Sequence, residues 1–197
     1  GYFSFSLFTP ILFKFQGPII AGQFGMTWAI VGVFGSIANS WLAPKIPQFA
    51  MFIAKKNYSS LDKLFWKLVR IIFIIVTSLS LFFIIFLLIL HQLNYPIAIK
   101  LSTRFLDILP VIFFMLAQIL ITTSTPFSAY MRAHKKEPLM FLSLLSAVLI
   151  SLSTFISGKY YSVLEMSIGY FVVNMFLIPV VIYLWYNFRS REILKNI

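Results

Sequence analysis

Long apolar runs separated by short polar segments organise this chain. Six of the runs are each long enough to cross about 30 Å of hydrocarbon as a helix that rises about 1.5 Å per residue. Their approximate ranges are 2–21, 27–53, 71–90, 105–131, 138–157 and 164–188. Because the runs are continuous and do not alternate in segments of about ten residues, they favour helices over the strands of a membrane barrel. We therefore expect an all-α membrane protein with six transmembrane helices.

The composition agrees with a membrane protein and narrows the function classes. Hydrophobic residues make up 60% of the 197 residues and charged residues 11%, whereas soluble domains are roughly half apolar and about a quarter charged. The net charge of +11 would indicate a nucleic-acid partner in a soluble chain, but in a membrane protein basic loops explain it better. We therefore expect no nucleic-acid partner. The absence of cysteine excludes disulfides and thiolate chemistry.

The basic residues orient the predicted helices. Eleven Lys and Arg residues fall in one set of predicted loops and three in the other. The larger set comprises Lys55, Lys56, Lys63, Lys67, Arg70, Arg132, Lys135, Lys136, Arg189, Arg191 and Lys195. The smaller set comprises Lys100, Arg104 and Lys159. Because cytoplasmic loops carry the excess of Lys and Arg, the larger set is expected in the cytoplasm, and six spans then place both ends of the chain there.

The loop over 57–70 carries a pattern of its own. Its apolar residues recur at helical spacing: Leu61, Leu64, Phe65 and Leu68. Basic residues occupy the other faces, and Ser59 with Asp62 forms a weak capping box. This pattern predicts an amphipathic helix that lies on the lipid headgroups, without a partner-binding role.

Several kinds of chemistry have no support in the sequence. The chain contains no Gly-rich phosphate loop ending in Lys-Ser or Lys-Thr and no HExxH motif. Its two histidines, His91 and His134, fall in loops on opposite sides of the membrane, and no two carboxylates are spaced as an acid–base pair. We therefore expect no metal, no cofactor and no enzymatic activity.

Two lysines, Lys14 and Lys45, fall inside predicted spans. An ammonium group in hydrocarbon must snorkel to the surface, pair with an anion or face water, and no acidic residue is placed to pair with either. Pro44 and Pro47 are expected to break the second span, and irregular backbone is tolerated beside a water-filled cavity. The two lysines therefore indicate an anionic ligand, although snorkelling explains Lys45 equally well.

Polar residues near these lysines could line the same cavity. They are Gln16, Asn39, Trp41 and Gln118. The first three lie within six residues of one of the lysines in sequence, and the fourth lies within the fourth span. For Gln118 an interhelical hydrogen bond is the commoner role.

Several short segments carry a family resemblance. Residues 9–17 (TPILFKFQG) and 21–26 (AGQFGM) are followed by Trp41, Lys45 and Pro47. Two later blocks follow. One is residues 52–55 (FIAK) with Leu61 and Asp62 shortly after them, and the other is residues 130–138 (YMRAHKKEP). In order and spacing these segments resemble the O-antigen and polysaccharide flippases of the multidrug/oligosaccharidyl-lipid/polysaccharide exporter superfamily. The similarity covers roughly the first 140 residues, and the last two spans agree only in hydropathy.

The resemblance implies a protein of twelve or fourteen helices in two lobes around a central cavity. Residues 1–197 would form the later six-helix lobe, and the missing N-terminal lobe would be its partner; the start of the chain within an apolar run agrees with this expectation. Such proteins move undecaprenyl-diphosphate-linked oligosaccharide across the bacterial inner membrane. By this resemblance Lys14 and Lys45 would contact the diphosphate, and Arg132 and Lys135 would attract the headgroup at the cytoplasmic mouth, although a solvated basic loop explains the latter two equally well.

Three alternatives remain open from the sequence. A drug or small-molecule exporter of the same superfamily would be expected to have an acidic cavity. A membrane enzyme of polysaccharide assembly would be expected to have a large outer loop that carries Arg, His or acidic residues. A small six-span protein that acts as a homodimer would have its own start near Gly1.

Overall fold

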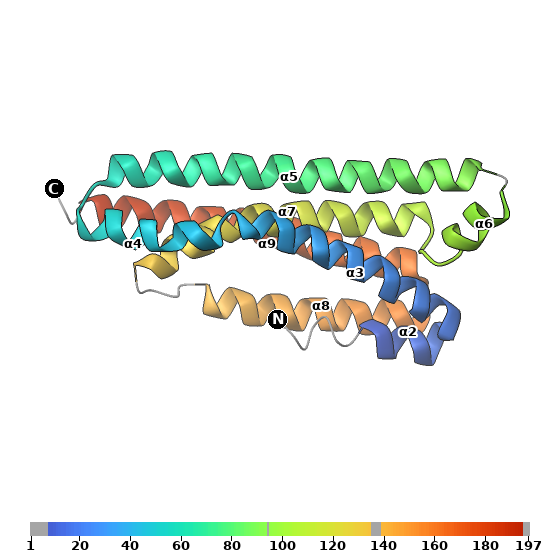
Figure 1. Cartoon of the computed structure of the whole chain (residues 1–197). Coiled ribbons are helices and arrows are strands. Elements are labelled where there is room, and N and C mark those ends of the chain that lie inside the picture. Colours follow the sequence, from blue (N-terminus) through green and yellow to red (C-terminus); the bar gives the residue numbers. More distant parts are fainter. Residues whose placement is uncertain (1–7, 94, 135–138, 195–197) are drawn as a thin grey trace.

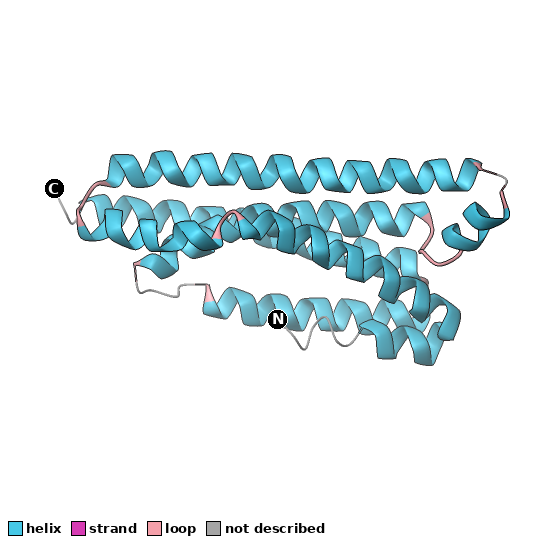
Figure 2. Ribbon diagram, in the orientation of Figure 1, coloured by secondary structure: helices cyan, strands magenta, loops and turns pink. Residues whose placement is uncertain are grey.

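The computed structural model describes residues 8–93, 95–134 and 139–194, and all regular structure in these ranges is helical (Figures 1 and 2). The helices in chain order are α2 (Phe8–Gln16), α3 (Pro18–Ser40), the 3-10 helix η1 (Ala43–Lys45), α4 (Ile46–Ala54), α5 (Tyr58–Gln92), α6 (Pro96–Ser102), α7 (Ile108–Ala133), α8 (Met140–Tyr160) and α9 (Val163–Leu194). The long helices lie side by side as an elongated bundle, with α6 at one end (Figure 1).

Within the described ranges, five helical segments are long and apolar enough to cross a membrane. They are Pro18–Ala54, Tyr58–Gln92, Ile108–Ala133, Met140–Tyr160 and Val163–Arg191. The chain is therefore a multi-pass helical membrane protein. The sixth predicted span and the cytoplasmic position of both ends stay predictions.

The structure differs from the expected continuous helix over 2–21. The helix α2 ends at Gln16 and α3 begins at Pro18, while residues 1–7 lie outside the described ranges. Between the two helices Gly17 has φ 95°, a left-handed conformation that glycine adopts without steric cost. Pro18 then occupies the first helical position, which needs no backbone N–H. Hydropathy alone does not register this break, because both sides of it are apolar.

The predicted break of the second span is confirmed. The helix α3 ends at Ser40, η1 follows, and α4 continues from Ile46, with Pro44 inside η1. Tight turns satisfy the backbone there, since the Leu42 N–H donates to the Asn39 carbonyl at 2.9 Å and the Lys45 N–H donates to the Leu42 carbonyl at 2.9 Å. The break therefore leaves these backbone donors paired even at membrane depth.

The segment 57–70 is not a separate interfacial helix, because it forms the first part of the continuous α5. Its apolar stripe is covered by protein instead of headgroups: Leu61 and Phe65 have no exposed surface. The cap is also different from the expected one. Asn57, and not Ser59, caps α5 by accepting a hydrogen bond from the Ser60 N–H at 3.1 Å.

Asp62 joins the start of α5 to the end of α9. It accepts two hydrogen bonds from the Arg189 guanidinium, of which the Nε–Oδ1 distance is 3.1 Å. The same guanidinium lies 5.8 Å from the Trp185 ring centroid. Trp185 in turn stacks on Phe65 at 4.8 Å between ring centroids. This group of side chains fastens α5 to α9 at one end of the bundle.

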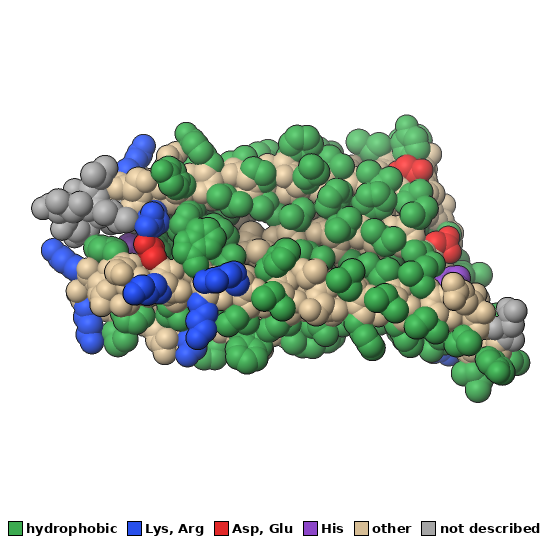
Figure 3. All heavy atoms as spheres, turned by 90° about the horizontal axis from the view of Figure 1, so that it is seen from above, with side chains coloured by type: hydrophobic (Ala, Val, Ile, Leu, Met, Phe, Trp, Pro, Cys, Tyr) green, Lys and Arg blue, Asp and Glu red, His purple; other side chains and the backbone are tan. Residues whose placement is uncertain are grey.

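Charge is distributed unequally between the two ends of the bundle. The start of α5, the connector that leads into it from α4 and the ends of α7 and α9 meet at the same end (Figure 1), and these segments carry eight of the thirteen Lys and Arg residues in the described ranges. On the face in Figure 3, Lys and Arg side chains gather at this end, and hydrophobic side chains cover the middle. We call this the basic end. The sequence prediction assigns it to the cytoplasm.

The ion pair between Asp62 and Arg189 should stabilise the folded bundle. Asp62→Asn or Arg189→Gln should each lower the free energy of unfolding by about 1–2 kcal/mol, because each leaves a half-buried charge unpaired. The double variant should lose less than the sum of the two losses. Unfolding in detergent, followed by circular dichroism, measures these changes. Strictly additive losses would contradict the pairing, and Lys63→Gln, an exposed change on the same helix, is the control.

Candidate functional site

A polar groove runs along α7 toward the basic end. Two adjoining cavities form it: one of about 380 Å³ between α3, α4 and α7, and one of about 200 Å³ between α7, α8 and α9. Ser128 of α7 lines both cavities. From Arg132 to Ser124 the groove follows α7 for roughly 12 Å by helical rise.

The first cavity takes its polar groups from two helices. Asn39 comes from the last turn of α3, and Thr125, Ser128 and Arg132 come from successive turns of α7. The Thr125 hydroxyl lies 2.7 Å from the Asn39 side-chain oxygen and 2.7 Å from the Thr122 carbonyl oxygen, and its one hydrogen is shared between these two acceptors. The contact with Thr125 fixes the Asn39 amide at the wall of the cavity. Arg132 is exposed, and it gives the cavity a positive charge at the end of α7.

The second cavity has aliphatic walls into which three helices place small polar side chains. They are Ser124 and Ser128 of α7, Ser143 and Ser146 of α8, and Asn174 of α9. Asn174 is buried, and its amide nitrogen donates to the Tyr170 carbonyl at 2.8 Å. This backbone bond leaves the amide oxygen of Asn174 available to the cavity.

Several groove side chains have unused hydrogen-bonding capacity. Among the described residues, the Asn39 amide nitrogen and the Asn174 amide oxygen have no partner, nor do the hydroxyls of Ser128 and Ser143. An amide nitrogen donates, an amide oxygen accepts, and a hydroxyl does both. The groove therefore offers donors and acceptors together with one cation. That combination suits a ligand rich in hydroxyl groups that also carries an anion.

The structure brings part of the predicted site together. Asn39 and Arg132 line the same cavity. Ala43 and Ile46 line this cavity too, whereas Lys45, which lies between them in sequence and is half-buried at the end of η1, does not line it. Trp41 opens the connector between α3 and α4 and is 55% exposed.

Lys14 and Gln16 lie elsewhere. They belong to the last turn of α2, and the 23 residues of α3 separate this turn from the connector, a distance of about 34 Å by helical rise. One diphosphate group cannot contact Lys14 and Lys45 at once. Lys14 is exposed beside the Phe15 ring at 5.5 Å from its centroid. The Gln16 amide nitrogen donates to the Tyr161 carbonyl at 3.0 Å.

Gln118 has a packing role in the structure. Its amide nitrogen donates to the Thr122 hydroxyl at 3.0 Å, and it lies directly against Gly35 of α3, where an added Cβ would meet the amide nitrogen at 2.1 Å. The hydrogen bond of Gln118 stays within α7 and is not the interhelical bond weighed above, and its contact with α3 is one of packing against Gly35. Lys135, the other residue expected at the mouth, lies outside the described residues.

Sequence reasoning did not find the serines of the groove. Serine is a common residue in apolar helices, and no motif marks Ser128, Ser143 or Ser146. Their spacing holds a weak signal, because Ser124, Ser128 and Arg132 recur every four residues and therefore share one face of α7. Only the packing of α8 and α9 shows that this face borders a cavity.

Comparison of the chain with models of protein families, with curated proteins and with solved structures finds no match. The functional argument therefore rests on the geometry of the groove and on the sequence resemblance.

The groove should admit water, and single cysteines can test this because the chain has none of its own. Ser128→Cys and Ser143→Cys should react with a water-soluble thiol reagent on the order of tenfold faster than Ser80→Cys, since the reactive thiolate forms readily only in a polar setting. Ser80 is 1% exposed within α5 and is the matched control. Mass spectrometry of the purified protein gives the labelling rates. Equal rates at the three positions would contradict an aqueous groove.

Proposed function

We propose that this chain is the later lobe of a flippase that moves undecaprenyl-diphosphate-linked oligosaccharide across the bacterial inner membrane. It works by alternating access, without covalent chemistry and without a bound cofactor. The observation that carries the proposal is the polar groove along α7 with Arg132 at its basic end. The sequence resemblance supplies the substrate class, and an N-terminal lobe of the same protein is the expected partner.

The lining of the groove agrees with such a substrate in two respects. Hydroxyl and amide side chains match the hydroxyl groups of a neutral sugar, since both partners donate and accept. A guanidinium binds phosphate oxygens with paired hydrogen bonds and keeps its charge at any physiological pH. In the proposal Arg132 therefore receives the diphosphate at the cytoplasmic entrance, with Lys45 nearby, and the sugar lies farther along α7.

Lys14 takes a different role in this proposal. It lies at the far end of α3 from Lys45, next to the opposite end of the bundle. A substrate that crosses the membrane leaves one cation and meets another, so Lys14 would contact the diphosphate only late in the transport cycle.

The charge of the residues that line the groove also bears on the nearest alternative function. A drug or cation exporter is expected to need carboxylates in its cavity, and among the described lining residues of the groove the only charged one is Arg132. This favours an anionic substrate. An enzyme of polysaccharide assembly stays an alternative, and the assay below separates it because an enzyme defect would change the glycan structure instead of its translocation.

Arg132→Gln should lower transport by the full-length protein about tenfold or more, because one charge-assisted contact to phosphate is lost. The measurement is surface polysaccharide in cells that depend on this protein, together with the lipid-linked oligosaccharide that accumulates inside. Arg70→Gln makes the same change on exposed α5 surface at the same end and should transport normally. Normal transport by Arg132→Gln, at equal protein levels, would refute the proposed role of Arg132.

The distances between the cations predict how their variants combine. Lys45→Gln should be non-additive with Arg132→Gln, since both act on the entering headgroup. Lys14→Gln should instead be additive with Arg132→Gln, because the two residues act at opposite ends of the bundle. Transport rates of the single and double variants give the coupling. Strong coupling between Lys14 and Arg132 would contradict the separation of their roles.

A further inference from the structure

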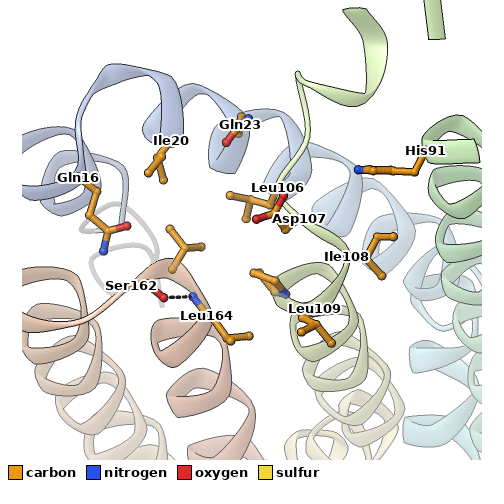
Figure 4. Close-up of a pocket in the computed structure, with 12 residues that line it drawn as sticks. Gln16, Ile20, Gln23, His91, Leu106, Asp107, Ile108, Leu109, Ser162 and Leu164 are labelled. Atoms are coloured by element: carbon orange, nitrogen blue, oxygen red, sulfur yellow. Dashed lines mark hydrogen bonds between the residues drawn. The ribbon is translucent and has the colours of Figure 1, made fainter. Parts of the chain in front are cut away.

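A third cavity, of about 500 Å³, lies at the end of the bundle opposite the basic end (Figure 4). We call it the end pocket. Its walls come from α2, α3, the end of α5, the segment that leads into α7 and the start of α9. Its polar lining residues are Gln16, Gln23, His91, Asp107 and Ser162. The remaining lining residues are aliphatic: Ile20, Leu106, Ile108, Leu109, Pro110, Val163 and Leu164.

The two glutamines present their oxygens to this pocket. The Gln16 amide nitrogen donates to the Tyr161 carbonyl at 3.0 Å, and the Gln23 amide nitrogen donates to the Thr103 carbonyl at 2.9 Å. Each amide nitrogen therefore binds a backbone carbonyl of a connecting segment, between α8 and α9 for Gln16 and between α6 and α7 for Gln23. The amide oxygens have no partner among the described residues, and Figure 4 shows both side chains at the rim of the same hollow.

His91 also faces the pocket. Its Nδ1 lies 3.0 Å from the Leu87 carbonyl oxygen. A carbonyl only accepts, so Nδ1 carries the hydrogen, and Nε2 is the ring nitrogen that is left for a ligand. The ring extends from α5 toward Asp107 in Figure 4.

Asp107 supplies the only formal charge among the residues that line the end pocket. It directly precedes α7 but makes no side-chain cap with that helix. Among the described residues the carboxylate also has no ion pair. The Ser162 hydroxyl is engaged elsewhere, because it donates to the Glu165 carboxylate and accepts from the Leu164 N–H at 3.2 Å.

The end pocket therefore combines aliphatic walls with unused hydrogen-bond acceptors and one negative charge. A ligand that matches it carries a positive charge, several N–H donors and an apolar body. A quaternary ammonium fits poorly, because it has no N–H and is usually held by aromatic rings, and no Phe, Tyr or Trp lines the pocket. A bare metal ion also fits poorly, because the described residues contain no group of three metal-binding side chains.

We propose that the end pocket binds the primary ammonium group of an amphipathic amine, and that the source is an aminophospholipid headgroup. The pocket lies where α5 ends and α7 and α9 begin, which is the level of the headgroups for helices that cross the bilayer. The three donors of an ammonium group then meet the Asp107 carboxylate, the amide oxygens and His91. This binding is independent of the flippase proposal.

Three lipids of equal charge and equal phosphate content test this proposal. Phosphatidylethanolamine, its N,N-dimethyl derivative and phosphatidylcholine differ in the number of N–H donors. They are titrated against the purified full-length protein in detergent, and native mass spectrometry counts the bound lipid. Wild-type protein should bind phosphatidylethanolamine about tenfold more tightly than phosphatidylcholine, since charge-assisted hydrogen bonds are lost in the latter. The dimethyl lipid should fall between them.

Asp107→Asn should remove most of this preference without lowering the unfolding temperature, because Asp107 caps no helix. The matched control is Glu165→Gln, the same change at the same end of the bundle. Glu165 does not line the pocket, and glutamine can still accept from the Ser162 N–H. The control should keep the wild-type preference.

Free ethanolamine distinguishes the two sources of the ammonium group. If free ethanolamine does not displace the bound lipid at millimolar concentration, the ligand is the lipid headgroup. If it does displace the lipid, the same site also binds soluble amines. Equal binding of the three lipids by wild-type protein would overturn the proposal. A preference that survives Asp107→Asn, or that Glu165→Gln abolishes equally, would also overturn it.

Discussion

The absence of hydrogen-bonding partners in hydrocarbon is the constraint on which the rest of this structure depends. Each backbone N–H and C=O at membrane depth must be paired within the protein, and helices achieve this for most of the chain. The two breaks meet the same requirement by tight turns: the Gly17 N–H donates to the Leu12 carbonyl at 3.1 Å, and the Lys45 N–H donates to the Leu42 carbonyl at 2.9 Å. These breaks change the direction of the chain, and the second brings the connector beside the groove.

The same constraint explains how the helices hold together. Apolar side chains gain little by leaving lipid tails, so close packing and specific contacts must join the helices. Aromatic stacking such as that of Phe65 on Trp185 is one device, and the close approach of Gln118 to Gly35 is another. Polar residues inside the bundle thus divide into those used in packing and those left unused. Only the second kind, such as Ser128 and the Asn39 amide nitrogen, are available to a ligand.

Hydropathy predicts the long helices α5, α7, α8 and α9 and the gathering of basic segments at one end, because both follow from local sequence. It places a loop over 22–26, however, where α3 runs without a break from Pro18 to Ser40, and it does not predict the short helix α6. It does not predict what covers an apolar stripe: the pattern over 57–70 is the same whether headgroups or protein bury it. The candidate site was predicted in part. Asn39 and Arg132 line one cavity, but Lys14 was predicted to lie inside a continuous first span, which Gly17 interrupts. The end pocket was not found, since its residues come from separate segments of the chain.

The position of the groove limits what can lie against it. Ser143 and Ser146 fall in the first turns of α8, Asn174 lies near the middle of α9, and Asn39 lies in the last turn of α3. Lipid tails cannot satisfy these groups, so the groove must face water, a polar ligand or another protein surface. A second lobe that encloses the groove meets this requirement and leaves an aqueous path between the lobes. The unpaired groups therefore require a polar neighbour, and the second lobe of the proposed flippase is one surface that would supply it.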